Sequence, residues 1–217
     1  FAVQTSLSVV MAFHSKLFNV PNVVCYFRLV LICGAVSCLH DPWVFISLAA
    51  VSMSLDLVDG FLARRLGQCT PFGAVLDIMV DIVSRSVMYT AAVVFSAPHR
   101  GLLVVATVIP TCEWICFFAT QSTSEHTEHW KNRVALAPWL VKQIMANGFK
   151  SLVGGFSMWG CWGLPFGLCL DAIVPVKWRA VTQFLVFTCF LGRACCFFAE
   201  CFFIYVKLLD ILEKHDE

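Results

Sequence analysis

Six runs of mostly apolar residues constrain this chain more than any other feature. They cover about residues 22–39, 43–66, 73–97, 101–120, 144–170 and 178–209. A helix that crosses a bilayer needs about 20 mostly apolar residues. Hydrophobic residues make up 59% of the chain and charged residues 13%, whereas a soluble domain has about 25% charged residues. The pattern predicts an all-α, polytopic membrane bundle of six transmembrane helices and excludes a soluble globular enzyme.

The links between the runs predict their arrangement. Residues 40–42 and 98–100 are short links, so neighbouring helices should be antiparallel. Glycines and Pro165 should break the fifth run. We expect a juxtamembrane or interfacial segment at 1–18, the six-helix membrane domain at 19–209 and a cytosolic tail at 210–217. Lys and Arg are more frequent in the links on the side of both termini, which predicts that this side is cytosolic.

The remaining composition excludes other classes. Most of the twelve cysteines lie inside apolar runs, where thiols act as small hydrophobic groups, so neither a disulfide framework nor a zinc site is expected. A net charge of +1 gives no indication of a nucleic-acid partner.

Four aspartates interrupt the second and third apolar runs. A carboxylate inside a membrane is costly, so such residues are candidates for function. Asp56 and Asp59 are three residues apart, and Asp77 and Asp81 are four apart, so each pair shares a helix face. The short link at 67–72 should join the two helices as a hairpin. We therefore expect the four carboxylates to converge near the cytosolic end.

Converging carboxylates repel one another unless cations lie between them. Oxygen ligands suit Mg²⁺ or Mn²⁺, and two-metal sites typically serve phosphoryl transfer. Arg64 could bind a phosphate, while Gly60 and Gly73 would let a base or diphosphate approach the backbone. Two alternatives remain open. The acids could form a proton relay or cation path in a transporter, and the glycines could serve helix packing.

Together these residues form the pattern Asp56-x2-Asp59-Gly60-x2-Ala63-Arg64-x8-Gly73-x3-Asp77-x3-Asp81. The pattern resembles the signature of the CDP-alcohol phosphotransferase family, also called class I CDP-alcohol phosphatidyltransferases. The resemblance implies a homodimeric six-helix membrane enzyme whose site faces the cytosol. It implies two divalent ions, Mg²⁺ or Mn²⁺, and CMP as the leaving group. The implied metal ligands are Asp56, Asp59, Asp77 and Asp81, the residues for the CDP moiety are Gly60, Arg64, Thr70 and Gly73, and the catalytic general base is Asp81.

A second stretch, Val20-Pro21-Asn22-x3-Tyr26-x-Arg28, resembles the start of eukaryotic phosphatidylinositol synthases. This resemblance implies CDP-diacylglycerol and myo-inositol as substrates and the endoplasmic reticulum as location. The stretch from Gln68 to Asp77 also resembles phosphatidylglycerophosphate synthases, so glycerol 3-phosphate remains an alternative acceptor. A non-catalytic transporter or scaffold that keeps the fold remains another alternative. Ile82 and Cys112-Glu113-Trp114 depart from the inositol branch and leave the acceptor open.

Two further groups of polar residues have competing interpretations. Arg193 and Glu200 share a helix face and could form an ion pair inside the bundle or contact the acceptor alcohol. The pair is the favoured interpretation. Two glutamates and two histidines in the polar loop after the fourth run could bind a metal, but a solvated loop is favoured. These four residues are Glu125, His126, Glu128 and His129.

Overall fold

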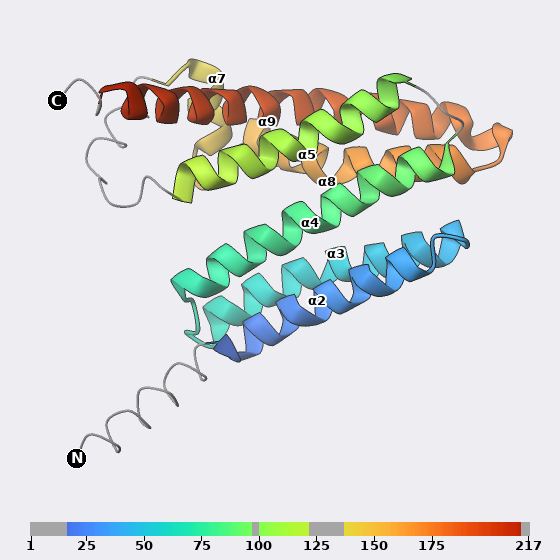
Figure 1. The fold of residues 1–217 in the computed structure, drawn as a ribbon, viewed down its shortest axis with the longest axis horizontal. Helices are drawn as coiled ribbons and strands as arrows, with labels where there is room; N and C mark the ends of the chain where they lie inside the picture. Colours follow the sequence, from blue (N-terminus) through green and yellow to red (C-terminus); the bar gives the residue numbers. More distant parts are fainter. Residues whose placement is uncertain (1–16, 97–99, 122–136, 214–217) are drawn as a thin grey trace, which may run out of the picture. The chain divides into compact units, whose positions relative to one another are not determined.

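The computed structural model describes residues 17–96, 100–121 and 137–213, and helices account for nearly all of them (Figure 1). The described residues contain no β-strand. Within the described residues, five helices are long and apolar enough to cross a membrane, namely α2, α3, α4, α5 and α8, whose bounds follow below. The predicted all-α, polytopic membrane bundle is confirmed. The chain divides into two compact units, residues 1–87 and 88–217.

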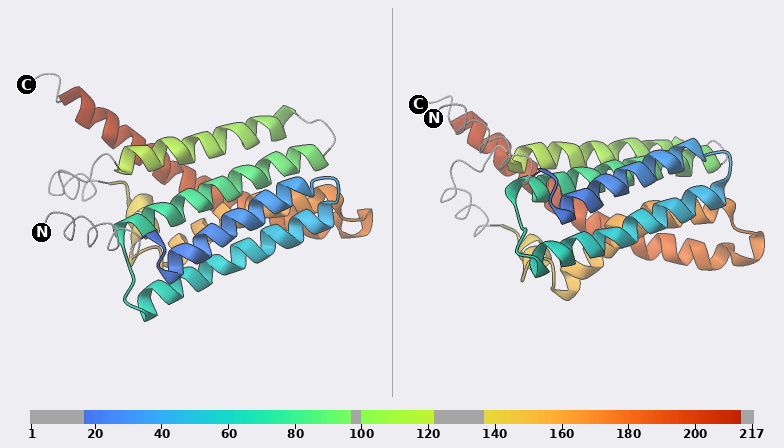
Figure 2. Two further views of the ribbon diagram at one scale, coloured as in Figure 1. Left: turned by 60° about the horizontal axis from the view of Figure 1, so that its bottom comes forward. Right: turned by 90° about the horizontal axis from the view of Figure 1, so that it is seen from below.

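The first unit contains α2 (Val20–Ser37), α3 (Pro42–Arg65) and α4 (Pro71–Phe95) up to Val87. α2 and α3 pack side by side in opposite directions, joined by a short turn (Figures 1 and 2). Their buried apolar residues are Ile32, Ala35, Phe45, Ile46 and Ala49. The expected antiparallel arrangement therefore holds for these two helices.

Side-chain caps determine where these helices begin. The Asn19 side chain accepts a hydrogen bond from the Asn22 N–H at 3.0 Å, and Asp41 accepts from Trp43 and Val44. Such caps satisfy backbone donors that the first helical turn leaves free. Proline follows closely in both helices, where its missing N–H costs nothing.

A glycine turn ends α3 and aims the chain into α4. Gly67 has a φ of 63°, a left-handed conformation that glycine adopts without strain. The Gln68 N–H donates to the Ala63 carbonyl oxygen at 3.0 Å, a hydrogen bond that commonly closes the end of a helix. α4 then begins at Pro71. The short predicted link between the two aspartate-bearing helices is thus observed.

The second unit contains the end of α4, α5 (Arg100–Gln121), α7 (Trp139–Met145), α8 (Leu152–Ile173), the 3₁₀ turn η1 (Val176–Trp178) and α9 (Arg179–Glu213). One core cluster combines Tyr89, Ile109, Leu164 and Cys189. A second combines Ala137, Val141, Ile144 and Ala199. Residues from α9 contribute to both clusters, so this long helix packs against both parts of the core of the second unit (Figure 2).

Two glycines let α8 and α9 approach very closely. A Cβ on Gly160 would collide with the backbone of Arg193 and Gly192, and a Cβ on Gly192 would collide with the Phe156 carbonyl oxygen. Small residues at such crossings are typical of membrane helix pairs. The close approach fixes the position of Arg193 on α9.

The fifth predicted span differs from the structure. The helix is not broken at Pro165, which lies buried inside α8. The break occurs earlier, where Asn147, Gly148 and Phe149 have φ between 54° and 65° and separate α7 from α8. Ser151 then caps α8 by accepting from the Gly154 N–H at 2.9 Å. Residues in the left-handed region cannot continue a right-handed helix, so the helix ends at this stretch.

The other predicted spans correspond to single helices. α9 coincides with the sixth span but carries Arg193 and Glu200, and it is not among the five spanning candidates. Two predictions fall on residues that the structure does not describe. These are the interfacial segment 1–18, apart from Leu17 and Phe18, and the two glutamates and two histidines of the polar loop. All twelve cysteines are free thiols in the structure.

Candidate active site

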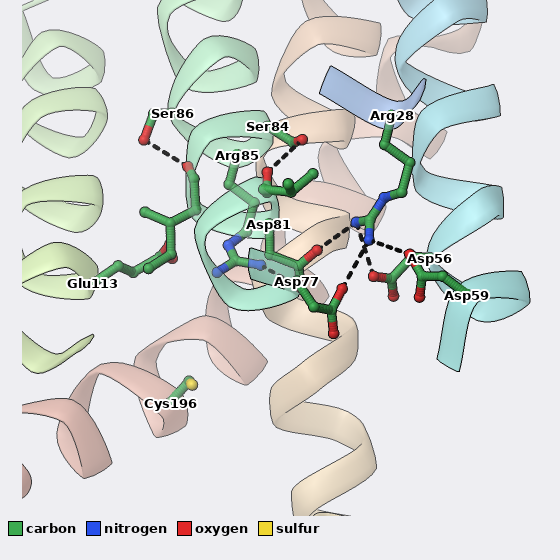
Figure 3. A network of polar contacts seen from close by, with 12 residues as sticks. Arg28, Asp56, Asp59, Asp77, Asp81, Ser84, Arg85, Ser86, Glu113 and Cys196 are labelled. Carbon is green, nitrogen blue, oxygen red and sulfur yellow. Dashed lines mark hydrogen bonds and ion pairs between the residues drawn. The ribbon is translucent and has the colours of Figure 1, made fainter. Parts of the chain in front are cut away.

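The four aspartates lie together where α3 and α4 meet (Figure 3). Asp56 and Asp59 come from α3, and Asp77 and Asp81 from α4. Their side chains are 24%, 4%, 41% and 17% exposed, respectively. The cluster therefore has a buried floor at Asp59 and an open edge at Asp77. Convergence of the carboxylates agrees with the spacing in the sequence.

A fifth side chain, Arg28 of α2, lies in the middle of the cluster. Its Nη1 is 2.8 Å from Asp59 Oδ2 and 2.9 Å from Asp77 Oδ1. Its Nη2 is 2.8 Å from Asp56 Oδ1 and 2.5 Å from Asp81 Oδ1. The guanidinium is fully buried. Each terminal nitrogen thus joins one carboxylate of α3 to one of α4, as the dashed lines in Figure 3 indicate.

Three neighbours complete the polar surroundings. Arg85, one turn after Asp81 on α4, places Nη1 3.5 Å from Asp81 Oδ2. The Cys25 thiol, on the buried face of α2, lies 3.4 Å from Asp59 Oδ2. The Ser52 hydroxyl donates to the Arg28 carbonyl oxygen at 3.3 Å and ties α2 to α3 beside the cluster. The carboxylates are therefore held from all three helices of the first unit.

A pocket of about 120 Å³ opens beside the carboxylates. Asp59 and Asp77 line it, together with Gly60, Gly73 and Asn22. Pockets that enclose a drug-sized ligand measure roughly 300–1,000 Å³. This pocket is therefore of a size for one end of a larger substrate, next to acidic groups.

Position 73 must be glycine because the Asn22 side chain lies very close to it. A Cβ at Gly73 would lie 2.7 Å from Asn22 Oδ1 and 3.1 Å from Thr70 Oγ1. The Thr70 hydroxyl accepts from the Gly73 N–H at 3.0 Å, so Thr70 also caps α4. Both predicted residues line the pocket.

Gly60 and Arg64 lie on the α3 side of the site. The Arg64 guanidinium folds back along its helix, with Nη1 3.5 Å from the position of a Cβ on Gly60. Gly60 lines the pocket, and Arg64 is exposed. An exposed guanidinium beside a glycine at the rim could bind a phosphate bidentately.

The donor atoms of the site fit divalent cations. Two groups have ligand atoms within 4.8 Å of one another: Cys25, Asp59 and Asp77 form one, and Asp56, Asp77 and Asp81 form the other. The second group offers only carboxylate oxygens, which suit Mg²⁺ or Mn²⁺. These aspartates are the residues that would hold the ions.

The sequence analysis used Asn22 and Arg28 only for a resemblance, and it assigned none of Arg28, Asn22 and Cys25 a role in the site. All three are buried on one face of α2 at intervals of three residues. Two signals in the sequence could have revealed them. Arg28 is a charged residue in an apolar run, and the three residues follow one another at helical spacing.

A second buried polar cluster lies in the second unit. Arg193 of α9 places Nη2 3.1 Å from Glu113 Oε1 of α5 and 2.9 Å from Glu200 Oε2 of α9. The favoured interpretation of Arg193 and Glu200 as an ion pair inside the bundle is confirmed. Glu113, for which the sequence favoured the same kind of interior pairing, joins that pair.

Fold and site together define an integral membrane protein with an acidic, metal-compatible centre between two helices. The family model for CDP-alcohol phosphatidyltransferase matches residues 18–209. The chain therefore belongs to this family. The predicted membership is confirmed.

Curated relatives fall into two groups. A probable CDP-diacylglycerol–inositol 3-phosphatidyltransferase 2 of Arabidopsis thaliana is 33% identical over 59% of this chain and 56% of its own length. The Arabidopsis CDP-diacylglycerol–inositol 3-phosphatidyltransferase 1 is 34% identical over 46% of this chain and 45% of its own length. A CDP-diacylglycerol–glycerol-3-phosphate 3-phosphatidyltransferase of Pseudomonas fluorescens is 29% identical over 65% of this chain and 85% of its own length.

The chain thus spans about half the length of the two Arabidopsis relatives. No solved structure matches it.

Proposed function

We propose that this protein transfers a phosphatidyl group from CDP-diacylglycerol to a polar alcohol and releases CMP. The observation that carries the proposal is the convergence of Asp56, Asp59, Asp77 and Asp81 beside the pocket lined by Gly60 and Gly73. Membership of the CDP-alcohol phosphatidyltransferase family supports the same reaction. The domain that carries it is the six-helix bundle over residues 19–209.

The residues have distinct roles in this reaction. Gly60, Thr70 and Gly73 bind the CDP moiety in the pocket that they line, and Arg64 binds a phosphate at its rim. The four aspartates would hold divalent ions, whose positive charge would stabilise the charge on the transferred phosphate. Asp81 accepts the proton of the attacking alcohol as general base.

The balance of the step follows from these roles. The alcohol oxygen bonds to the phosphorus that carries diacylglycerol. The bond from that phosphorus to the oxygen shared with CMP breaks, and CMP leaves with the bonding electrons. The hydroxyl proton passes to the Asp81 carboxylate, so atoms and charges balance.

Myo-inositol is the proposed acceptor. The inositol-transferring relatives from Arabidopsis support it, as does the stretch from Val20 to Arg28. Glycerol 3-phosphate is the second candidate, favoured by the relative from Pseudomonas fluorescens, of which the chain covers a larger share. We also propose that the protein forms a homodimer, that it lies in the endoplasmic reticulum membrane, and that its site faces the cytosol.

The test is CMP release by the purified protein in detergent with Mg²⁺ or Mn²⁺ and CDP-diacylglycerol. Inositol, glycerol 3-phosphate, serine, choline and ethanolamine are added singly as acceptors. Release that depends on inositol is the expected result, and release only with glycerol 3-phosphate would correct the acceptor. Absence of turnover with every alcohol would reject the enzyme in favour of a transporter or scaffold.

A further inference from the structure

Arg28 occupies the centre of the candidate site, although the four-aspartate signature does not include it. Its guanidinium is fully buried, so its charge must be compensated locally. All of its charged contacts among the described residues are to the four aspartates, at 2.5 to 2.9 Å. Its Nε has no hydrogen-bond partner among the described residues. The side chain is therefore held in place by these carboxylates.

The two terminal nitrogens of Arg28 divide the aspartates into two pairs. Nη1 contacts Asp59 and Asp77, which both belong to one candidate group of metal ligands. Nη2 contacts Asp56 and Asp81, which both belong to the other group. A cation bound in either group would share carboxylates with the guanidinium (Figure 3).

The charge balance of the cluster shows how Arg28 would affect metal binding. Four ionised carboxylates opposed by Arg28 and Arg85 leave two net negative charges. Two divalent ions would change this to two positive charges, which the two negative charges of a diphosphate diester would neutralise. Arg28 thus repels the metal ions, but it also holds together carboxylates that would otherwise repel one another.

We propose that Arg28 is a resident counter-cation of the metal site, acting as a positioning residue. It keeps the four carboxylates in one arrangement before metal binds, and it lowers the affinity for the metal with which it shares them. The inference rests on the proposed function only in taking the aspartates as metal ligands. The competing interpretation is a helix clamp that stabilises the fold and has no effect on metal binding.

The test compares the wild-type protein with Arg28→Gln in detergent. Mn²⁺ affinity is measured by electron paramagnetic resonance, and thermal unfolding is measured with and without Mn²⁺. We expect Arg28→Gln to bind Mn²⁺ at least about tenfold more tightly, because a repelling charge is lost. Its Tm without metal should fall, and its Tm rise on adding Mn²⁺ should exceed that of the wild type. An unchanged or weaker Mn²⁺ affinity would overturn the inference.

Arg193→Gln is the matched control. Arg193 is also buried and contacts two carboxylates, Glu113 and Glu200, in the second unit. This variant should lower the Tm equally with and without Mn²⁺ and leave the Mn²⁺ affinity unchanged. A Mn²⁺ response that changes as much as in Arg28→Gln would overturn the inference.

Arg28→Lys decides the matter if Arg28→Gln does not fold. One ammonium group contacts fewer carboxylates than the guanidinium, so Mn²⁺ should bind more tightly than to the wild type. Equal or weaker binding would overturn the inference. No Mn²⁺ binding to any variant would overturn both this inference and the proposed metal site. Turnover by the wild type, with unchanged affinity in the variants, would overturn the inference alone.

Discussion

At the scale of single residues, charge pairing holds the candidate site together. Arg28 lies within 2.9 Å of an oxygen of each of four aspartates, and Asp59 is only 4% exposed. Removing one partner of a buried ion pair costs about 3–5 kcal/mol, because the remaining charge is left uncompensated. Individual replacements in this cluster therefore need a measurement of folding beside a measurement of activity.

Asp81→Asn tests the proposed general base. The amide has nearly the shape of the carboxylate but cannot accept the proton of the alcohol, so kcat should fall by about 10²–10⁴-fold. CMP release and thermal unfolding are both measured. The control is Asp171→Asn on α8, where the carboxylate accepts a hydrogen bond from Thr182 outside the cluster. It should remain active, and near-wild-type turnover by Asp81→Asn would contradict the assignment.

Gly73→Ala tests the close approach of Asn22 in the pocket. The added Cβ would lie 2.7 Å from Asn22 Oδ1, so the Asn22 side chain must move from its place in the pocket wall. We expect the KM for CDP-diacylglycerol to rise by at least about tenfold, which corresponds to about 1.4 kcal/mol. Gly155→Ala is the control, since nothing lies within 4 Å of that Cβ position. An unchanged KM for Gly73→Ala would contradict the assignment of Gly73 to the CDP pocket.

At the scale of elements, helix ends and one glycine crossing determine the arrangement. Caps at Asn19, Asp41 and Ser151 set the starts of α2, α3 and α8. Gly67 ends α3 in a left-handed conformation, and the chain then enters α4 at Pro71. The site depends on this turn, because the turn places the aspartates of α3 opposite those of α4.

Gly160→Ala tests the crossing of α8 and α9. The added methyl group would collide with the backbone of α9, and overpacking of this kind costs about 1–3 kcal/mol. The free energy of unfolding in detergent micelles should fall by that amount. Gly155→Ala, on the same helix, should be neutral or stabilising, because alanine favours the helix by about 1 kcal/mol over glycine. Equal stability of both variants would mean that α8 and α9 do not approach so closely.

At the scale of the whole molecule, the alternation of spans predicts the membrane side of each link. Cys69 is exposed in the link between α3 and α4, which we expect on the cytosolic side. Val176, 79% exposed in the link between α8 and α9, should lie on the opposite side. Sealed microsomes with the cytosolic face outward, treated with an impermeant maleimide, should label Cys69 in the wild type.

Val176→Cys in a Cys69→Ser background is the matched comparison. It should be labelled only after the vesicles are permeabilised. Labelling of both positions before permeabilisation, or labelling in the opposite order, would reject the proposed orientation. Cys69→Ser alone measures labelling of the remaining thiols.

The aspartate hairpin shows how far prediction from sequence reaches. The spacing of Asp56, Asp59, Asp77 and Asp81 places each pair on one helix face, and the short link brings the faces together. Both are local properties of the chain. The break before α8 was missed because the left-handed residues Asn147 to Phe149 are embedded in a continuous apolar run.

The sequence by itself determined the fold class, most of the spans and the four carboxylates, because a long apolar run crosses lipid as a helix and lipid rarely admits a charge. Only the tertiary structure revealed Arg28 in the centre of the aspartates and the contact of Gly160 with Gly192. The Arg28 contacts join residues between 28 and 53 positions apart. Such contacts depend on how three helices pack, and helical periodicity identifies a buried face but not the residue that it meets.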